Sequence, residues 1–180
     1  MRSAFVLLTS LCAIMTPDIG TAPRAQSLQP AQWREIAWPF PRDAWPSGKA
    51  FTCADKSCGG EAVLSVRVKL GFCNCDAGIR DDDEVDNVAD VDMITPDFRP
   101  TGPGEAIKVA EFSGRIRSYD YTANGKPRTA LGLALASKCD LIAISVNSTR
   151  MDDIELRRAA LERLNAQDLL KWVNRQLGEK

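Results

Sequence analysis

The sequence predicts an α+β fold, in which an antiparallel β-meander sheet is packed by a C-terminal helix and by short helices and is stapled by disulfides. Three observations support this fold class. Residues 107–148 hold alternating apolar patterns separated by tight-turn signals, as in an antiparallel meander. Residues 151–180 repeat apolar side chains at helical spacing. Five cysteines follow an export signal, and exported chains form disulfides because their compartment is oxidising.

The N-terminus has the pattern of a secretory signal peptide. Met1-Arg2 is a short basic start, "SAFVLLTSLCAIM" is an apolar run, and small residues follow in "GTAPRAQS". The apolar run is shorter than the roughly 20 residues that a membrane-spanning helix needs. We therefore expect residues 1–25 to be a signal peptide, cleaved after Ala22 or Ala25. The prediction is a periplasmic or secreted protein with no stable membrane span after the leader is removed.

Residues 26–50 are rich in proline and tryptophan. Because the residue before each proline favours extended backbone, this segment is expected to form an extended strap laid on the body of the protein. Trp33, Trp38 and Trp45 are its candidate anchors, with a glycan- or peptide-binding aromatic strip as the alternative. Residues 51–180 then form a single α+β domain, a size that is normal for one domain.

The segment "AVLSVRVKLGF" predicts a half-buried strand bounded by Gly59-Gly60 and Gly71. One of its faces is apolar, and the other carries Arg67 and Lys69, which we expect to project into solvent. The apolar face consists of Leu64, Val66, Val68 and Leu70.

The meander is predicted from three later segments. Asn124-Gly125 is a strong signal for a two-residue hairpin turn. "RTALGLALA" alternates leucines with small residues, "SKCD" marks the next turn, and "LIAISVNS" is a buried strand. The small residues permit another layer to approach closely, and we expect the C-terminal helix on that face. The leucines are Leu131, Leu133 and Leu135, and the small residues are Gly132, Ala134 and Ala136.

The C-terminal segment predicts a helix that begins at Asp152-Asp153 and ends at Gly178. Asn165 and Asp168 indicate a bend near residues 165–166. The expected apolar stripe consists of Ile154, Leu161, Leu164, Leu169, Trp172 and Val173. Five basic residues are expected to face water: Arg157, Arg158, Arg163, Lys171 and Arg175.

An acidic run, Asp81–Asp92, follows the first strand. Its first three aspartates suit an N-cap and first helical turn, where carboxylates complement the helix dipole. The alternative is a calcium-stabilised structural domain, although the run lacks the central glycine and terminal glutamate of an EF-hand loop. The candidate metal ligands are Asp81, Asp83, Asp86 and Asp90, together with Asp92.

The five cysteines beyond the leader allow two bridges at most. Cys53 and Cys58 can face each other across a hairpin, and Cys139 can pair with Cys73 or Cys75, with a Cys58–Cys73 bridge as the competing arrangement. A thiol-redox or metal-handling protein that uses Cys73 and Cys75 is the alternative. A zinc site made of four cysteine thiolates is a weaker alternative, because the cysteine spacings differ from those of C-x2-C zinc knuckles.

The composition restricts the function. The chain contains no histidine, the usual general base and metal ligand, and no catalytic constellation is recognisable. A net charge of −1 gives no reason to expect a nucleic acid as partner. We therefore expect a non-enzymatic, exported binding or accessory domain of unknown ligand, with no cofactor apart from the calcium alternative. Another exported protein is a candidate partner.

The segment "FTCADKSCGGEAVLSVRVKLGFCNC", followed by "DDDEVDNVADVD", resembles a group of small exported proteins from alphaproteobacteria. The resemblance rests on the five cysteines, "GFCNC" and the acidic run, and it covers roughly residues 38–147. It implies an extracytoplasmic location and no particular activity. The meander with its long terminal helix is also similar in architecture to Mog1/PsbP-like sandwich domains.

Overall fold

The computed structural model describes residues 31–54, 61–72, 75 and 77–178. The predicted signal peptide lies outside this part of the chain. An eight-stranded antiparallel sheet has the order β1-β2-β3-β8-β7-β6-β4, and β5 pairs with β6 beside this path. The strands are β1 (Arg34–Ile36), β2 (Lys49–Cys53), β3 (Ala62–Lys69), β4 (Arg99–Pro100), β5 (Glu105–Val109), β6 (Phe112–Ala123), β7 (Lys126–Ser137) and β8 (Asp140–Ser148). The predicted α+β fold with an antiparallel sheet is confirmed.

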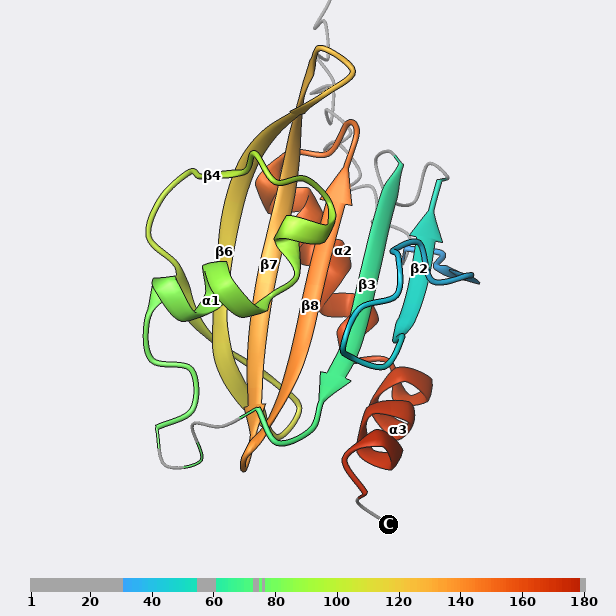
Figure 1. Ribbon diagram of the computed structural model, residues 1–180. Coiled ribbons are helices and arrows are strands. Elements are labelled where there is room, and N and C mark those ends of the chain that lie inside the picture. Colours follow the sequence, from blue (N-terminus) through green and yellow to red (C-terminus); the bar gives the residue numbers. More distant parts are fainter. Residues whose placement is uncertain (1–30, 55–60, 73–74, 76, 179–180) are drawn as a thin grey trace, which may run out of the picture.

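Helices cover both faces of the sheet (Figure 1). The helix α1 (Asp82–Val88) and the short 3-10 helix η2 (Val91–Met93) lie on one face, against β6 and β7. The helices α2 (Asp153–Leu164) and α3 (Gln167–Gln176) lie on the other, against β7, β8 and β3. No helix in the described part of the chain is long and apolar enough to cross a membrane.

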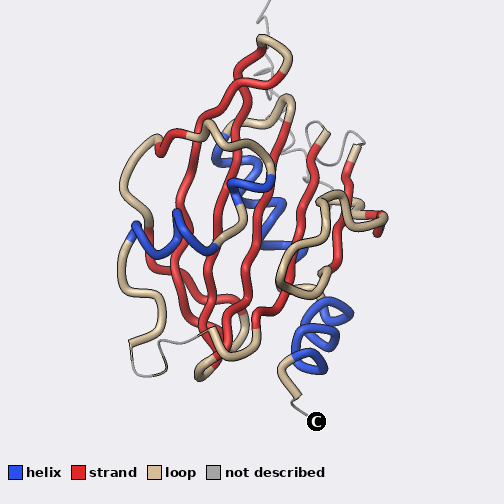
Figure 2. Tube along the Cα trace, in the orientation of Figure 1, coloured by secondary structure: helices blue, strands red, loops and turns tan. Residues whose placement is uncertain are grey.

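The longest hairpin, β6–β7, reaches beyond the ends of the other strands (Figure 2). Its turn residues Asn124 and Gly125 have φ angles of 53° and 70°. Both lie in the left-handed region that a two-residue turn of this kind requires. The strands pair in register from Ala123↔Lys126 at the turn to Ser113↔Ala136 at the far end. The predicted hairpin is therefore confirmed.

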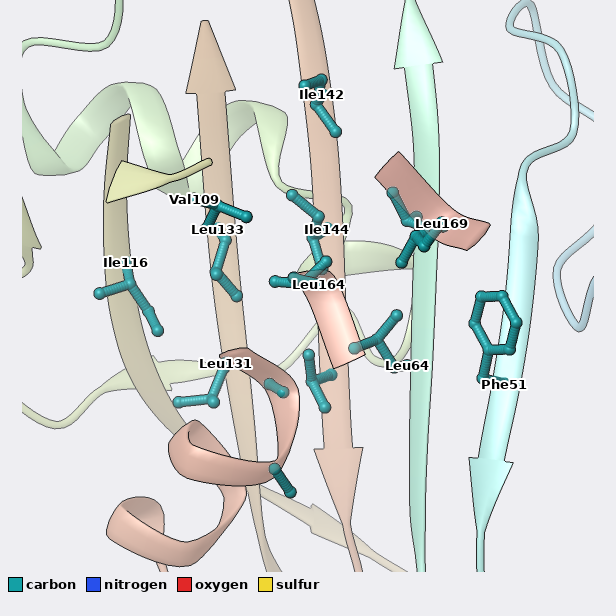
Figure 3. Close-up of a cluster of buried hydrophobic side chains, with 14 of the residues drawn as sticks. Phe51, Leu64, Val109, Ile116, Leu131, Leu133, Ile142, Ile144, Leu164 and Leu169 are labelled. Atoms are coloured by element: carbon teal, nitrogen blue, oxygen red, sulfur yellow. The ribbon is translucent and has the colours of Figure 1, made fainter. Parts of the chain in front are cut away.

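The two faces of β7 are covered by different helices. The leucines of β7 belong to the large core on which the C-terminal helices pack (Figure 3). The opposite face carries Gly132, where an added Cβ would lie 2.8 Å from Val91 Cγ2 and 3.1 Å from Ala89 Cβ. The prediction that the C-terminal helix covers the small-residue face is therefore wrong. The α1–η2 segment is the layer that lies close to the small residues of β7, whereas the C-terminal helices pack on the leucines of its other face.

The C-terminal segment forms two helices with a break at Asn165–Ala166, as predicted. Asp152 caps α2 by accepting a hydrogen bond from the Glu155 amide at 2.8 Å. The predicted place of Ile154 in the apolar stripe is wrong, because its side chain is 77% exposed. With the cap at Asp152, the core face of α2 begins one turn further on. The buried residues of the two helices are Leu156, Ala159, Ala160, Leu164, Leu169 and Val173.

Candidate functional site

A buried network of charges joins β3 to the turn between α1 and η2. The Arg67 guanidinium donates to the Asp90 carboxylate at 2.6 and 2.8 Å and to Asp43 at 2.8 and 2.9 Å. Lys69 Nζ donates to the same Asp90 at 2.7 Å. The side chains of Arg67 and Lys69 are only 3% and 6% exposed. The prediction that they project into solvent is wrong, because the turn after α1 supplies a counter-charge that the strand pattern could not reveal.

Tryptophans from the segment before β2 contact this network and the core. The Trp38 ring lies 5.9 Å from the Arg67 guanidinium carbon, and the Trp45 ring lies 5.9 Å from Lys69 Nζ. Trp33 instead packs against the large core. Because both cations are neutralised within the fold, we interpret the network as a structural anchor for this segment.

A second set of ion pairs joins α1 to β6. Asp82 accepts from Arg115 Nη2 at 2.5 Å. Asp86 accepts from Arg117 Nη1 at 2.6 Å and from the Tyr119 hydroxyl at 2.6 Å. Burial raises the pKa of the Tyr119 phenol well above its usual range, and the hydrogen bond to Asp86 adds to this rise. These contacts attach the acidic face of α1 to the sheet.

The candidate calcium ligands lie in different environments. Asp81 is the N-cap of α1, as predicted, and accepts from the Glu84 amide at 2.9 Å. Asp86 and Asp90 are bound to the cations of β6 and β3, whereas Asp83 and Asp92 are exposed. Over residues 31–54, 61–72, 75 and 77–178, no group of three or more His, Cys, Asp and Glu side chains is arranged to hold a metal ion. Calcium stabilisation stays a prediction.

Cys75 and Cys139 form a disulfide that joins the segment after β3 to the β7–β8 turn, across 64 positions of sequence. This confirms one of the two pairings expected for Cys139. Because Cys75 is bonded to Cys139 in the structure, it is not paired with Cys73 as the redox alternative requires. Cys53 is also disulfide-bonded. Cys58 and Cys73 lie outside the described residues, so a Cys53–Cys58 bridge stays a prediction.

A hollow of about 1050 Å³ opens beside the tip of the β6–β7 hairpin. Its volume lies just above the range of small-molecule sites, about 300–1,000 Å³. Residues 96–100, the hairpin arms at 120–122 and 127–129, and the β8–α2 connection at 148–151 line it. We refer to it as the arginine hollow, after Arg99, Arg128 and Arg150.

The backbone framework positions each arginine of the hollow. Arg99 lies on β4, which pairs with β6. Arg128 lies on β7 directly opposite Tyr121 in the hairpin ladder. Arg150 follows Ser148, whose Oγ accepts a hydrogen bond from the Arg150 amide at 3.2 Å and donates one to the Glu61 carbonyl at 2.9 Å. Three segments that are distant in sequence are thereby brought to one cavity.

The three arginines of the hollow form no ion pairs with the residues that the structure describes, although Asp120 lies opposite Arg99 in the β4–β6 ladder. None of their guanidinium groups forms an ion pair or a side-chain hydrogen bond with another residue that the structure describes. A guanidinium presents a planar fork of N–H donors that matches carboxylate and phosphate groups. The hollow can therefore receive an anionic group. Other cations of the sheet and of α2 are instead paired with carboxylates: Arg67, Lys69, Arg115, Arg117, Arg157 and Arg163.

The hollow is also lined by two aspartates and two aromatic residues. Asp97 and Asp120 line it, and neither carboxylate forms an ion pair with a described residue. Tyr121 and Phe98 also line it, and their side chains pack against the core under α1. Burial raises the pKa of the Tyr121 phenol, and the positive charge of the neighbouring Arg128 opposes this rise. The lining thus combines a small excess of positive charge with free acceptors.

A smaller hollow of about 370 Å³ lies near the β7–β8 turn. Its carboxylates include groups that hold the backbone: Asp81 caps α1, and Asp140 accepts from the Gly71 amide at 2.8 Å. We therefore regard this hollow as part of the framework around the Cys75–Cys139 disulfide. Its apolar lining consists of Phe72, Ile79, Val88 and Leu141.

The sequence interpretation missed all three arginines of the hollow. Each lies in or beside a turn-rich segment, namely "FRPTGP", "GKPRT" and "NSTRM", and this was the only signal available. No spacing relates them, because strand pairing and the path of the β8–α2 connection bring them together.

No family model matches the sequence, and no curated protein matches it. Among solved structures, the chain is similar to LpqN of Mycobacterium tuberculosis, described as involved in cell envelope biogenesis. The TM-score is 0.38 and the sequence identity is 19%, and the match covers 71% of this chain and 72% of that chain. This likeness is too weak to establish a shared family or function, so the comparisons assign the chain to no family.

Proposed function

We propose that this protein is an extracytoplasmic, non-enzymatic binding domain that captures an anionic ligand in the arginine hollow. One observation carries the proposal. Arg99, Arg128 and Arg150 all line a single large hollow, and none forms an ion pair with a carboxylate among the described residues. Arginine is the side chain best suited to hold a carboxylate or phosphate group, because its fork can donate two parallel hydrogen bonds.

Location outside the cytoplasm is supported by the cysteines and by the N-terminus. Cys75 and Cys139 are bridged, and Cys53 is also disulfide-bonded. Disulfides persist in oxidising compartments and are rare in the cytosol. The predicted signal peptide at residues 1–25 points the same way.

Binding is supported better than catalysis. The chain has no histidine, and the carboxylates that face β3 and β6 are engaged by cations. A carboxylate held in an ion pair is a poor general base, because its negative charge is stabilised where it stands. The arginines and aspartates of the hollow form no ion pair with a described residue, which suits recognition.

Isothermal titration of the exported protein with citrate and with inositol hexakisphosphate tests the proposal. We expect binding that weakens with rising salt, because the arginines are open to solvent. We expect at least about tenfold weaker binding by the triple variant Arg99→Gln, Arg128→Gln, Arg150→Gln, because each substitution removes charge-assisted hydrogen bonds to the anion. The control variant carries the same change in charge outside the hollow, as Lys108→Gln, Lys171→Gln, Arg175→Gln. It should bind the anions as tightly as the parent protein does. Equal affinity of the two triple variants would contradict the proposal.

A further inference from the structure

We infer that the arginine hollow selects hydrogen phosphate, an oxyanion that keeps a proton at neutral pH, and that Asp120 recognises this proton; the inference rests on the proposed anion-binding function. The observation that carries it is a row of side chains across the sheet. Arg99 of β4 lies directly opposite Asp120 of β6, and Asp120 lies directly opposite Thr129 of β7. All three residues line the hollow.

The row lies on the face of the sheet that the C-terminal helices cover. Directly opposite residues of an antiparallel pair share a face, and so do residues two positions apart along a strand. Thr129 is two positions before Leu131, which belongs to the core under these helices. Asp120 is two positions after Ser118, whose hydroxyl donates to the Asp153 carboxylate of α2. The floor of the hollow is therefore the part of this face where the β6–β7 hairpin extends beyond α2 (Figure 1).

The row places a carboxylate between two hydrogen-bond donors. Neighbouring strands lie about 4.8 Å apart, so one small anion can reach side chains of adjacent strands. Arg99 supplies charged N–H donors, and the Thr129 hydroxyl can donate or accept. The β8–α2 connection brings Arg150 to the same hollow. Arg128 lies opposite Tyr121, on the other face of the hairpin, so it is not part of the row.

Asp120 is not used as the counter-charge of Arg99. Its side chain is exposed, and it forms no ion pair or side-chain hydrogen bond with a residue that the structure describes. An ionised carboxylate only accepts hydrogen bonds. It repels a fully ionised anion held by Arg99, but it accepts a hydrogen bond from an anion that keeps an O–H group.

Inorganic phosphate has this O–H group, and sulfate does not. The two anions share a tetrahedral shape, but phosphate keeps at least one proton at neutral pH, whereas sulfate is fully ionised. Arg99 and Arg150 would then donate charge-assisted hydrogen bonds to the bare oxygens, while Asp120 accepts from the protonated one. The carboxylate in the row therefore favours phosphate over sulfate.

Titration calorimetry of the exported protein tests the inference with inorganic phosphate, sulfate and glycerol phosphate. At about pH 8 a phosphate monoester has lost its second proton, whose pKa is about 6, while inorganic phosphate still carries one. We expect inorganic phosphate to bind at least about tenfold more tightly than either of the others, because neither can donate to Asp120.

Asp120→Ala gives the sharper result. The preference for phosphate over sulfate should fall at least about tenfold, because the acceptor of the O–H group and the source of repulsion are both removed. The matched variant is Asp97→Ala, which removes a carboxylate of the same hollow that is not in the row. It should tighten the binding of both anions alike and keep the preference. Circular dichroism confirms that each variant is folded.

The outcomes separate the two proposals. Arginine-dependent binding of citrate or inositol hexakisphosphate, without a preference for phosphate over sulfate, would overturn the recognition of a proton and leave anion binding standing. The inference is also wrong if glycerol phosphate binds as tightly as inorganic phosphate, or if Asp120→Ala keeps the preference for phosphate. If none of these anions binds, both proposals fail.

Discussion

Arg67 of β3 and Asp90 of the α1–η2 turn are joined side by side through two hydrogen bonds, at 2.6 and 2.8 Å. The same carboxylate accepts from Lys69 at 2.7 Å, so a single anion contacts two buried cations. Asp90 adopts a left-handed backbone, with φ 58°, which turns the chain from α1 into η2. This relationship fixes one layer of the fold to the centre of the sheet.

Removing the charge of Asp90 should be costly. Asp90→Asn keeps a residue that tolerates the left-handed backbone but leaves Arg67 and Lys69 short of a counter-charge. We expect a loss of about 3–5 kcal/mol in the free energy of unfolding, measured by urea denaturation. The exposed neighbour Asp92→Asn should stay within about 0.5 kcal/mol of the parent. If the two variants proved equally stable, the network would not be the anchor described.

Gly132 should not tolerate a side chain. In Gly132→Ala the new Cβ would lie 2.8 Å from Val91 Cγ2 and 3.0 Å from Tyr119 Cε2, so the covering layer must shift. Overpacking of this kind costs about 1–3 kcal/mol, visible as a lower melting temperature. Gly102→Ala, where an added Cβ meets nothing within 4 Å, is the control and should be nearly neutral. A neutral Gly132→Ala would show that the α1–η2 segment packs more loosely.

Acid should weaken the attachment of α1. The hydrogen bond from the Gly104 amide, with help from Arg115, lowers the pKa of the Asp82 carboxyl. A carboxyl group whose pKa is lower in the folded state stabilises the protein at pH values above its pKa in the unfolded state. This stabilisation is lost as the pH falls through the pKa of the folded state. Asp82→Asn should therefore be destabilising near neutral pH, and the difference from the parent should shrink below about pH 4.

Unfolding free energies of the parent and of Asp82→Asn, measured from about pH 7 down to about pH 2.5, check this dependence. Asp83→Asn, which removes an exposed carboxylate of the same helix turn, is the control and should show little difference at any pH. A constant gap between Asp82→Asn and the parent across the range would show that the ionised Asp82 carboxylate is not the source of the stabilisation.

The Cys75–Cys139 bridge should contribute strongly to stability. It closes a loop across 64 positions, and the chain-entropy model gives about 4 kcal/mol for a loop of that length. Cys75→Ser with Cys139→Ser should lower the free energy of unfolding by about that amount. Peptide mapping without reductant should recover the two cysteines linked to each other. A map that joins Cys75 to another cysteine would contradict the pairing.

Calcium should leave the melting temperature unchanged. Asp86 and Asp90, two of the candidate ligands, already neutralise cations on β6 and β3. Scanning calorimetry with millimolar calcium and with a chelator checks this expectation. A rise of several degrees with calcium, abolished by the chelator, would restore the alternative of a calcium-stabilised domain.

Local signals in the sequence were sufficient for much of the fold. The Asn124-Gly125 turn fixes the hairpin register, Asp81 caps α1, and the helix break falls at Asn165 as expected. Each of these features depends on a few neighbouring residues, so a sequence pattern can reveal it.

Features that depend on a second layer could not be read in the same way. The alternation of β3 shows that Arg67 and Lys69 share a face, but it does not show that Asp90 covers that face. The small face of β7 predicted a close neighbour without saying which helix it would be. Arg163 illustrates the same limit: it was expected in solvent, yet its guanidinium carbon lies 4.0 Å from the centre of the Phe51 ring.

The most direct test of the arginine hollow is to map where an anion binds on the folded protein. Amide chemical-shift changes on titration with citrate or inositol hexakisphosphate should concentrate in residues 96–100, 120–122, 127–129 and 148–151. They should vanish in the Arg99→Gln, Arg128→Gln, Arg150→Gln variant. Shifts centred elsewhere, or shifts that persist in that variant, would contradict the account that these three arginines form one ligand-binding site.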